Sequence, residues 1–205
     1  MTTDRFRPAR TAAGLAFVAA ASLALAACGT AGGGGQTREE AIAFAMSKSY
    51  PSALPVQYRK TDVADPTGEA PGTIVIETGQ RYLYLVEPNG RALRYGVGVG
   101  KEGFGWSGEA TVQNKQEWPD WVPPPEMLER RPDLPLRMSG GPENPLGARA
   151  MYLWKDGKDT LFRIHGTNEP LTIGKAMSSG CIRMINFDVV DLYSRVPIGT
   201  KVVVR

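Results

Sequence analysis

Cys181 lies in the segment AMSSGCIRM (176–184), sixteen positions after His165, the only histidine in the chain. A thiol becomes a strong nucleophile when a neighbouring imidazole takes its proton and the resulting ion pair stabilises the thiolate. A loop of this length is ample to bring the two side chains together. The pattern indicates thiol chemistry, although a lone cysteine is often a small buried hydrophobe and a single histidine is often structural.

The turn before the thiol adds a second feature of such a site. Gly180 lets the backbone bend so that consecutive N–H groups, including that of Cys181, can converge on one point, as an oxyanion hole requires. In an extended segment, the side chain of Arg183 leaves the same face as the thiol. It is expected to hold a substrate carboxylate or help keep the thiolate charged, unless it is a plain surface charge. These residues indicate a thiol acyltransferase or hydrolase.

The amino terminus has the pattern of a secretory signal peptide. Three arginines precede an apolar run rich in Ala and Leu over residues 11–27, too short and too Ala-rich for a good membrane-spanning helix. The run ends in LAAC, which resembles a bacterial lipoprotein cleavage box with Cys28 as the lipidated first residue. The alternative is cleavage after an A-x-A site such as the Ala24 and Ala26 pair. We predict a lipoprotein-type signal peptide over residues 1–27.

Export makes the remaining thiol unusual. If Cys28 carries lipid or is removed, Cys181 is the only free thiol, and an odd cysteine in an exported protein suggests an intermolecular bridge or a reactive nucleophile. Loss of residues 1–27 removes three arginines and one aspartate and lowers the formal net charge of +3 by two. A nearly neutral chain gives no electrostatic case for nucleic-acid binding. The remaining length suits one domain.

A tether, a short helix and an irregular connector are expected over residues 28–71. The Gly-rich sequence GTAGGGGQ is typical of a flexible tether that does not pack against a domain. Thr37 with Glu40 is expected to form a capping box for the helix. Residues 51–72 are dense in Pro, Asp and Thr, which is typical of irregular structure. The main domain is expected over residues 72–205.

That domain is expected to be mainly β, a sandwich or barrel-like sheet with a few short helices. Alternating apolar residues and turn signals predict a β-meander, a hairpin with an Asp-Gly turn, a helix and a final strand. These elements are expected at residues 73–77, 81–86 and 91–99, then 148–154 and 160–164, then 186–196, and last 200–205. Asn186 is expected to cap the helix, whose apolar residues are predicted to be Phe187, Val190 and Tyr193.

Two further stretches separate these elements. GVGVGKEG (96–103) fails as a phosphate loop, because Lys101 is followed by Glu102 in place of Ser or Thr. It is expected to be a strand and a flexible turn. Residues 104–146 are rich in Trp and Pro and are expected to form one long loop. That loop either walls the site with aromatic rings or simply holds itself onto the sheet.

The segment RIHGTNEPLTIGKAMSSGCIRMINFDVVDLY resembles the signature of the L,D-transpeptidases, bacterial cell-wall enzymes with a YkuD-type catalytic domain. The signature is His-Gly, then after a loop Ser-x-Gly-Cys, then Ile or Val and Arg. WPDWVPPPEM, GGPENPLGARAMYL and IVIETGQRYLYLVEPNG also resemble that domain, so the likeness covers about residues 72–205. Many members have His where Ser179 stands, so the supporting role of a second imidazole is absent here.

The resemblance implies that Cys181 is the nucleophile and His165 the base, with the Gly166 carbonyl orienting the imidazole. It also implies an oxyanion hole near the amides of Gly180 and Cys181. The supporting residues implied for oxyanion or substrate binding are Gly180, Ser178, Ser179 and Arg183.

The implied reaction is acyl transfer on peptidoglycan stem peptides. The thiolate attacks the carbonyl of the third residue of a tetrapeptide stem, usually diaminopimelate, expels D-alanine and leaves a thioester. Another stem's diaminopimelate then gives a crosslink, whereas a lipoprotein lysine, a free D-amino acid or water gives attachment, exchange or carboxypeptidase action. The sequence does not choose among these acceptors. Carbapenem-type β-lactams are also implied to acylate Cys181.

No cofactor is expected, because one histidine and one available cysteine make no zinc ligand set. The implied location is the periplasmic face of a bacterial membrane, with a lipid anchor at Cys28. Gly29, with no Asp after the lipidated residue, permits sorting to an outer membrane. One rival is a sortase-like or other thiol peptidase, in which His and Cys usually stand farther apart. The other is a non-catalytic peptidoglycan-binding lipoprotein, which has no need of an activated thiol.

Overall fold

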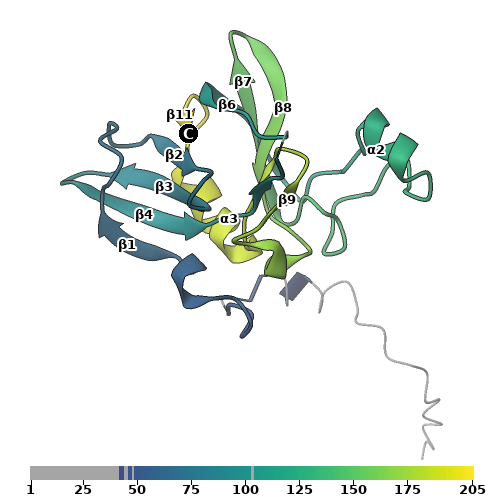
Figure 1. Ribbon diagram of the computed structural model, residues 1–205, viewed down its shortest axis with the longest axis horizontal. Helices are drawn as coiled ribbons and strands as arrows, with labels where there is room; N and C mark the ends of the chain where they lie inside the picture. The colour runs from purple at the N-terminus through teal and green to yellow at the C-terminus, as the bar shows by residue number, and fades with distance from the viewer. Residues whose placement is uncertain (1–41, 44–45, 48, 103) are drawn as a thin grey trace, which may run out of the picture. The chain divides into compact units, whose positions relative to one another are not determined.

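The computed structural model describes residues 42–43, 46–47, 49–102 and 104–205 (Figure 1). The predicted signal peptide, Cys28 and the predicted capping box at Thr37 lie outside these residues. Gln36–Arg205 form one compact unit. Within the described part of the chain, no helix is long and apolar enough to cross a membrane.

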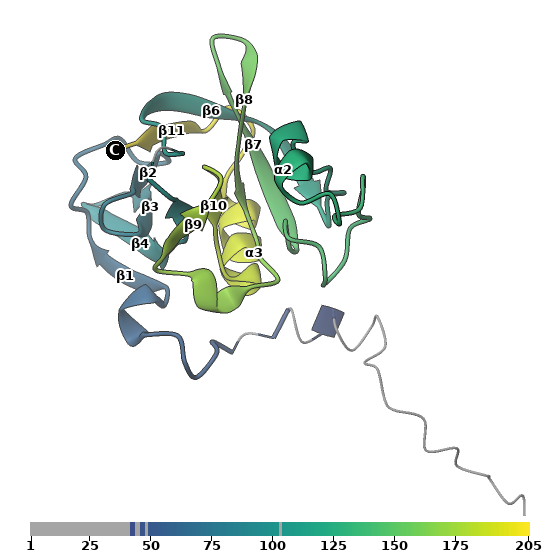
Figure 2. The same cartoon turned by 45° about the vertical axis from the view of Figure 1, so that its right-hand side comes forward.

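A nine-stranded mixed sheet dominates the domain, in the order β1-β4-β3-β2-β11-β6-β7-β8-β10 (Figures 1 and 2). Its strands are β1 (Thr61–Ala64), β2 (Ile74–Glu77), β3 (Tyr82–Glu87), β4 (Arg91–Gly96), β6 (Gly108–Glu117), β7 (Arg149–Lys155), β8 (Lys158–His165), β10 (Ile182–Arg183) and β11 (Lys201–Val204). A second, two-stranded sheet pairs β5 (Val99–Gly100) with β9 (Ala176–Ser178). The predicted mainly β fold with few short helices is confirmed.

The predicted meander and hairpin are both present. β2, β3 and β4 are consecutive antiparallel neighbours, and φ is positive at Asn89 (63°) and Gly90 (68°) in the turn between β3 and β4. Such φ values are what a tight hairpin turn requires. β7 and β8 join through Asp156 and Gly157, also with positive φ, and this hairpin projects beyond the rest of the sheet (Figure 1).

Two segments that were predicted to be irregular contain strands. β6 lies inside the expected loop 104–146 and pairs with β7 and β11, and β1 lies inside the expected connector and pairs with β4. Only Ala110 and Val112 are buried in β6, and β1 has a single partly buried residue, Val63. Neither segment therefore shows a clear apolar alternation, and pairing with neighbouring strands decides its conformation.

The longest described helix, α3 (Asn186–Arg195), packs against β7 and β8. The three apolar residues that marked this helix in the sequence are only half-buried: Phe187, Val190 and Tyr193. The buried apolar residues in and beside the helix instead follow the spacing i, i+4, i+7, i+11; they are Ile185, Val189, Leu192 and Val196. Elsewhere in the described residues, helical structure occurs at residues 42–43, in α2 (Pro125–Arg130) and in two 3-10 turns, Val56–Tyr58 and Pro170–Thr172.

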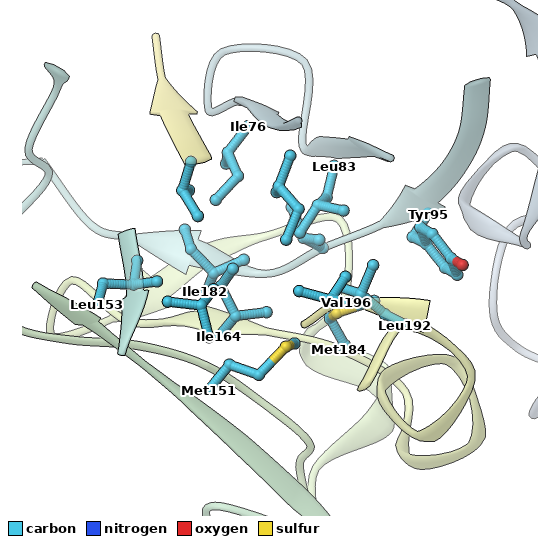
Figure 3. Close-up of a cluster of buried hydrophobic side chains, with 14 of the residues drawn as sticks. Ile76, Leu83, Tyr95, Met151, Leu153, Ile164, Ile182, Met184, Leu192 and Val196 are labelled. Atoms are coloured by element: carbon cyan, nitrogen blue, oxygen red, sulfur yellow. The ribbon is translucent and has the colours of Figure 1, made fainter. Parts of the chain in front are cut away.

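The core fills the space between the meander, β8, β10 and α3 (Figure 3). Ile164 and Ile182 lie in it with 0% and 2% exposure, and burying each stabilises the fold by about 1.5–3 kcal/mol. Each isoleucine directly neighbours a candidate catalytic residue, His165 or Cys181. Because successive side chains of a strand point to opposite faces, burial of the isoleucines directs the imidazole and the thiol away from this core.

Candidate active site

The parallel pairing of β8 with β10 brings the thiol and the imidazole to one region. Ile182 is paired with Ile164 and Arg183 with His165. Cys181 directly precedes β10, so it stands beside Arg163, two positions before the imidazole along β8. Aligned residues of parallel strands share a face. The expectation that Arg183 leaves the same face as Cys181 agrees with this register.

The Cys181 side chain is partly buried and is held against β8. Its Sγ lies 3.9 Å from the Leu161 carbonyl oxygen, the geometry of a weak S–H···O contact. Burial raises the pKa of the thiol, while the backbone N–H of Arg163 and the charges of Arg163 and Arg183 act in the opposite direction. The thiol is therefore protonated at neutral pH in the resting protein.

The imidazole of His165 is buried, with 4% exposure. Its Nδ1 lies 2.6 Å from the Gly166 carbonyl oxygen. A carbonyl only accepts, so Nδ1 carries the proton and Nε2 is the nitrogen that can act as a base. Burial lowers the pKa of His165 to about 4, although the carbonyls of Gly166 and Leu146 favour the protonated ring. The contact that the orienting role of Gly166 requires is thus present.

Both candidate reacting groups, the thiol and the imidazole, are neutral at rest. Among the described residues, the hydrogen bonds of Cys181 and His165 go to backbone groups, and none joins the two side chains. Because burial penalises both charged forms, a preformed thiolate–imidazolium pair is disfavoured in this state. The site suits general-base catalysis, in which the proton leaves sulfur as the substrate carbonyl is attacked.

The turn before the thiol is closed by Ser178. Its Oγ donates to the Cys181 carbonyl at 2.6 Å and accepts from the Gly180 N–H at 3.2 Å. The Gly180 amide, near which an oxyanion hole is expected, is therefore engaged with Ser178 in the resting protein; a serine hydroxyl often closes such a turn. Ser179 is exposed on the same turn. Gly180 has φ of 112°, which favours glycine.

Arg183 forms an ion pair with Glu169, with Nη1 and Oε2 3.0 Å apart. The arginine side chain is 21% exposed and the glutamate 62%. Its positive charge lowers the pKa of both Cys181 and His165. The arginine is thus oriented by a carboxylate of this chain and close enough to act on both reacting groups.

A bulge in β8 places residues that the sequence did not single out. The register between β7 and β8 shifts between Tyr152 and Trp154, and Leu161 there has φ of 64°. The bulge supplies the carbonyl that contacts Sγ, and Phe162 follows with its ring packed over Gly180. A leucine with positive φ leaves no sequence signal, because β-bulges arise from pairing between strands.

The start of the Trp-rich segment contributes an aromatic wall. Trp106 stacks on Phe162, with ring centroids 5.2 Å apart and planes 23° apart. It also lines a cavity of about 520 Å³ that borders Gly180 and Ile182, the residues on either side of Cys181. Trp106 therefore both lines this cavity and packs onto Phe162 of β8.

The rate of thiol alkylation should report the raised pKa. We expect the reaction of Cys181 with iodoacetamide, in protein lacking residues 1–28, to rise with pH to a midpoint above that of free cysteine, because burial favours the neutral thiol. Rates measured by intact mass from pH 6 to 10 give the midpoint. A midpoint below that of free cysteine would show a stabilised thiolate and overturn this assignment.

The family of the chain follows from comparison with known proteins. Residues 71–204 match the YkuD family, the L,D-transpeptidase catalytic domain. The chain belongs to this family. It is 36% identical over 138 residues to the probable L,D-transpeptidase ErfK/SrfK of Escherichia coli (strain K12), and 47% identical over 68 residues to the putative L,D-transpeptidase YqjB of Bacillus subtilis (strain 168). These matches cover 63% and 32% of this chain, but only 42% and 38% of the relatives' lengths.

Solved structures share the fold. A crystal structure of a probable carnitine operon oxidoreductase (caia) from Brucella melitensis is 53% identical with a TM-score of 0.51, and the match covers 74% of this chain and 96% of that chain. The name of that protein describes another activity. The carbamoyl enzyme of Ldtfm with avibactam has a TM-score of 0.51 at 20% identity, over 67% of this chain and 49% of that chain. This second likeness concerns the fold alone.

The described residues contain no cluster of side chains that could bind a metal ion. No group of three or more His, Cys, Asp or Glu side chains is arranged there to hold an ion. The polar groups that act on Cys181 and His165 are backbone carbonyls, a backbone amide, arginine side chains and, at Cys181, the carboxylate of Asp159.

Proposed function

We propose that this protein is a peptidoglycan L,D-transpeptidase that uses Cys181 as nucleophile and His165 as general base. The observation that carries the proposal is the register of β8 and β10, which sets a thiol and a base-competent imidazole on one face beside a positively charged arginine. The family membership supplies the reaction class. A peptidoglycan-binding lipoprotein without turnover has no use for this arrangement.

The reaction begins on a tetrapeptide stem. Sγ of Cys181 attacks the carbonyl carbon of the third residue, and its proton passes to Nε2 of His165. The Cys181 amide is our candidate for stabilising the developing oxyanion, since Gly180 N–H is engaged with Ser178. The bond to the terminal D-alanine breaks, the imidazolium gives its proton to the leaving amine, and a thioester remains.

An acceptor amine completes the cycle. It attacks the thioester carbonyl, His165 takes the amine's proton, and the thiolate leaves and is protonated from the imidazolium. The Nδ1 contact with Gly166 keeps Nε2 available in both half-reactions. The positive charge of Arg183 disfavours the imidazolium form of His165 and favours the thiolate form of Cys181. Once the thiol has reacted, this charge therefore promotes transfer of the proton from the imidazolium to the leaving amine.

Mass spectrometry of the compact unit, residues 36–205, tests the proposal. With disaccharide tetrapeptide as donor, we expect D-alanine release, a transient thioester mass on Cys181, and a product that depends on the amine supplied: a second stem, a lysine peptide, a D-amino acid or water. Folded protein that binds the donor without releasing D-alanine would favour the wall-binding alternative. Cleavage at another stem bond would favour a different thiol peptidase.

We also propose that the chain is exported and anchored by lipid at Cys28, on the periplasmic face of a bacterial membrane. The basic start, the apolar run and the LAAC sequence support this proposal. Incorporation of labelled palmitate by the full chain, lost in Cys28→Ser, is the expected result. Export with no incorporation would indicate ordinary cleavage, and fractionation of the labelled protein would distinguish an inner from an outer membrane.

Carbapenems should acylate the same thiol. Attack of Sγ on the strained β-lactam carbonyl opens the ring without loss of atoms, so we expect the intact mass to increase by the whole mass of the drug. Peptide mapping should place the adduct on the peptide that contains Cys181. An unchanged mass in protein that turns over stem peptides would contradict this expectation.

A further inference from the structure

Asn186 has a different role from the one its sequence position suggests. It is the first residue of α3, and the N-cap is Ile185, so Asn186 does not cap the helix. Its side chain is instead buried, with 8% exposure of the residue, and reaches backbone groups at the end of β8 and before the start of β7. A buried amide needs partners for both its oxygen and its nitrogen.

Three hydrogen bonds supply those partners. Oδ1 accepts from the N–H of Ala148 at 3.0 Å and from the N–H of Thr167 at 3.2 Å. Nδ2 donates to the carbonyl of Thr167 at 3.1 Å. One side chain therefore binds both strands of the hairpin at the point where His165 ends β8.

The bond to Thr167 acts on the imidazole through a single peptide group. The N–H of Thr167 and the C=O of Gly166 belong to the same planar unit and point in opposite directions. When Asn186 fixes the direction of that N–H, it also fixes the direction of the carbonyl, whose oxygen lies 2.6 Å from Nδ1 of His165. Asn186 thus orients the imidazole indirectly, through the Gly166–Thr167 peptide.

Two glycines make room for this contact. A Cβ at Gly147 or at Gly166 would collide with Oδ1 of Asn186. The backbone on both sides of the amide is therefore shaped to receive it. Gly147 also has φ of 63°, which favours glycine.

We propose that Asn186 is a positioning residue that sets the tautomer and orientation of His165 through the Gly166–Thr167 peptide. The inference rests on the proposed function for its catalytic consequence, but the tautomer itself is a property of the resting protein. Loss of Asn186 frees the Gly166 carbonyl to rotate, which releases Nδ1–H and allows the proton to move to Nε2, where it blocks the base.

The chain offers a direct measurement because His165 is its only histidine. We would record ¹⁵N spectra of the imidazole at pH 7 in protein without added histidines, for the parent, Asn186→Ala, Asn186→Asp and Val75→Ala. Val75 is buried in a separate cluster on the meander, so its variant is a control for destabilisation alone. Asn186→Asp keeps the oxygen that accepts both N–H groups.

We expect the parent and Val75→Ala to show protonated Nδ1 and free Nε2. Asn186→Ala should show a mixture of tautomers or mainly Nε2–H, and Asn186→Asp should keep the parent pattern. With turnover, Asn186→Ala should lower kcat at least about tenfold and change KM for the stem less than twofold, with partial recovery in Asn186→Asp. If Asn186→Ala does not fold, Asn186→Ser replaces it, since its hydroxyl is too short to reach both amides.

An unchanged tautomer in a folded Asn186→Ala or Asn186→Ser would overturn the inference, as would an equal change in Val75→Ala. These results are independent of substrate. A failure of the proposed function, seen as absent turnover in the parent, therefore remains distinguishable from a failure of the positioning role.

Discussion

Cys181→Ala should abolish acyl transfer and lower the rate of D-alanine release from a tetrapeptide stem by at least about a thousandfold. The sulfur forms the proposed covalent intermediate, and two groups hydrogen-bonded to Cys181 cannot replace it: Ser178 Oγ is engaged within the turn, and Leu161 offers only its carbonyl. Cys181→Ser should also be inactive within about the same limit, because an alcohol is far harder to ionise than a thiol.

Single-turnover assays followed by mass spectrometry measure this effect. Ser194→Ala, on the exposed side of α3, is a matched control for a small polar substitution away from the site. Thermal unfolding should leave Cys181→Ala close to the parent, because the residue is only partly buried. Retention of more than a few per cent of activity in Cys181→Ala would place the nucleophile elsewhere.

His165→Gln should lower the rate of thioester formation by about a hundredfold to ten-thousandfold at pH 7. The loss should shrink as pH rises, because hydroxide then ionises the thiol without the imidazole. In the parent, the base loses its activity only as pH falls toward about 4, the lowered pKa of His165. A parent rate that halves near pH 6.5 would show an unperturbed histidine, contrary to its burial.

The same substitution should change how stability depends on pH. The unfolded His165 titrates near 6.5 and the native one near 4. Between these values the unfolded chain binds a proton that the native chain does not, so the native state loses up to about 3 kcal/mol as pH falls through the window. His165→Gln removes this loss, and denaturant melts at pH 4 and pH 7 measure it.

A buried carboxyl opposes that slope in the parent. Asp188, in the first turn of α3, is fully buried and accepts a hydrogen bond from Tyr50 Oη at 2.9 Å, and burial raises its pKa to about 7. Between the ordinary carboxyl pKa and about 7, native Asp188 keeps a proton that the unfolded chain releases. Asp188 therefore stabilises the native state at acid pH, and this stabilisation is lost as pH rises through 7. The informative quantity is therefore the difference between His165→Gln and the parent, with Asp188→Asn as the opposite control.

Much of the fold could be predicted because its signals are local. The meander from Ile74 to Gly96 and the β7–β8 hairpin both show apolar alternation and turn residues that need positive φ. β6 and β1 could not be predicted, because polar residues occupy most of their positions and their partners lie far along the chain. The buried face of α3 could not be predicted either, since several apolar residues compete there and only packing selects among them.

The sequence by itself determined the family and singled out the thiol and the imidazole that we propose as nucleophile and base, because a family signature and the presence of a single histidine are properties of residue order alone. Only the tertiary structure decided the protonation state of that pair, since burial of Cys181 and His165 opposes charge on both. It also engaged the Gly180 amide, brought the Leu161 carbonyl to sulfur, and turned Asn186 from an expected helix cap into a clamp on the peptide beside the imidazole. These features depend on which backbone groups meet across β7, β8, β10 and α3, and contacts between distant segments exist only once the chain has folded.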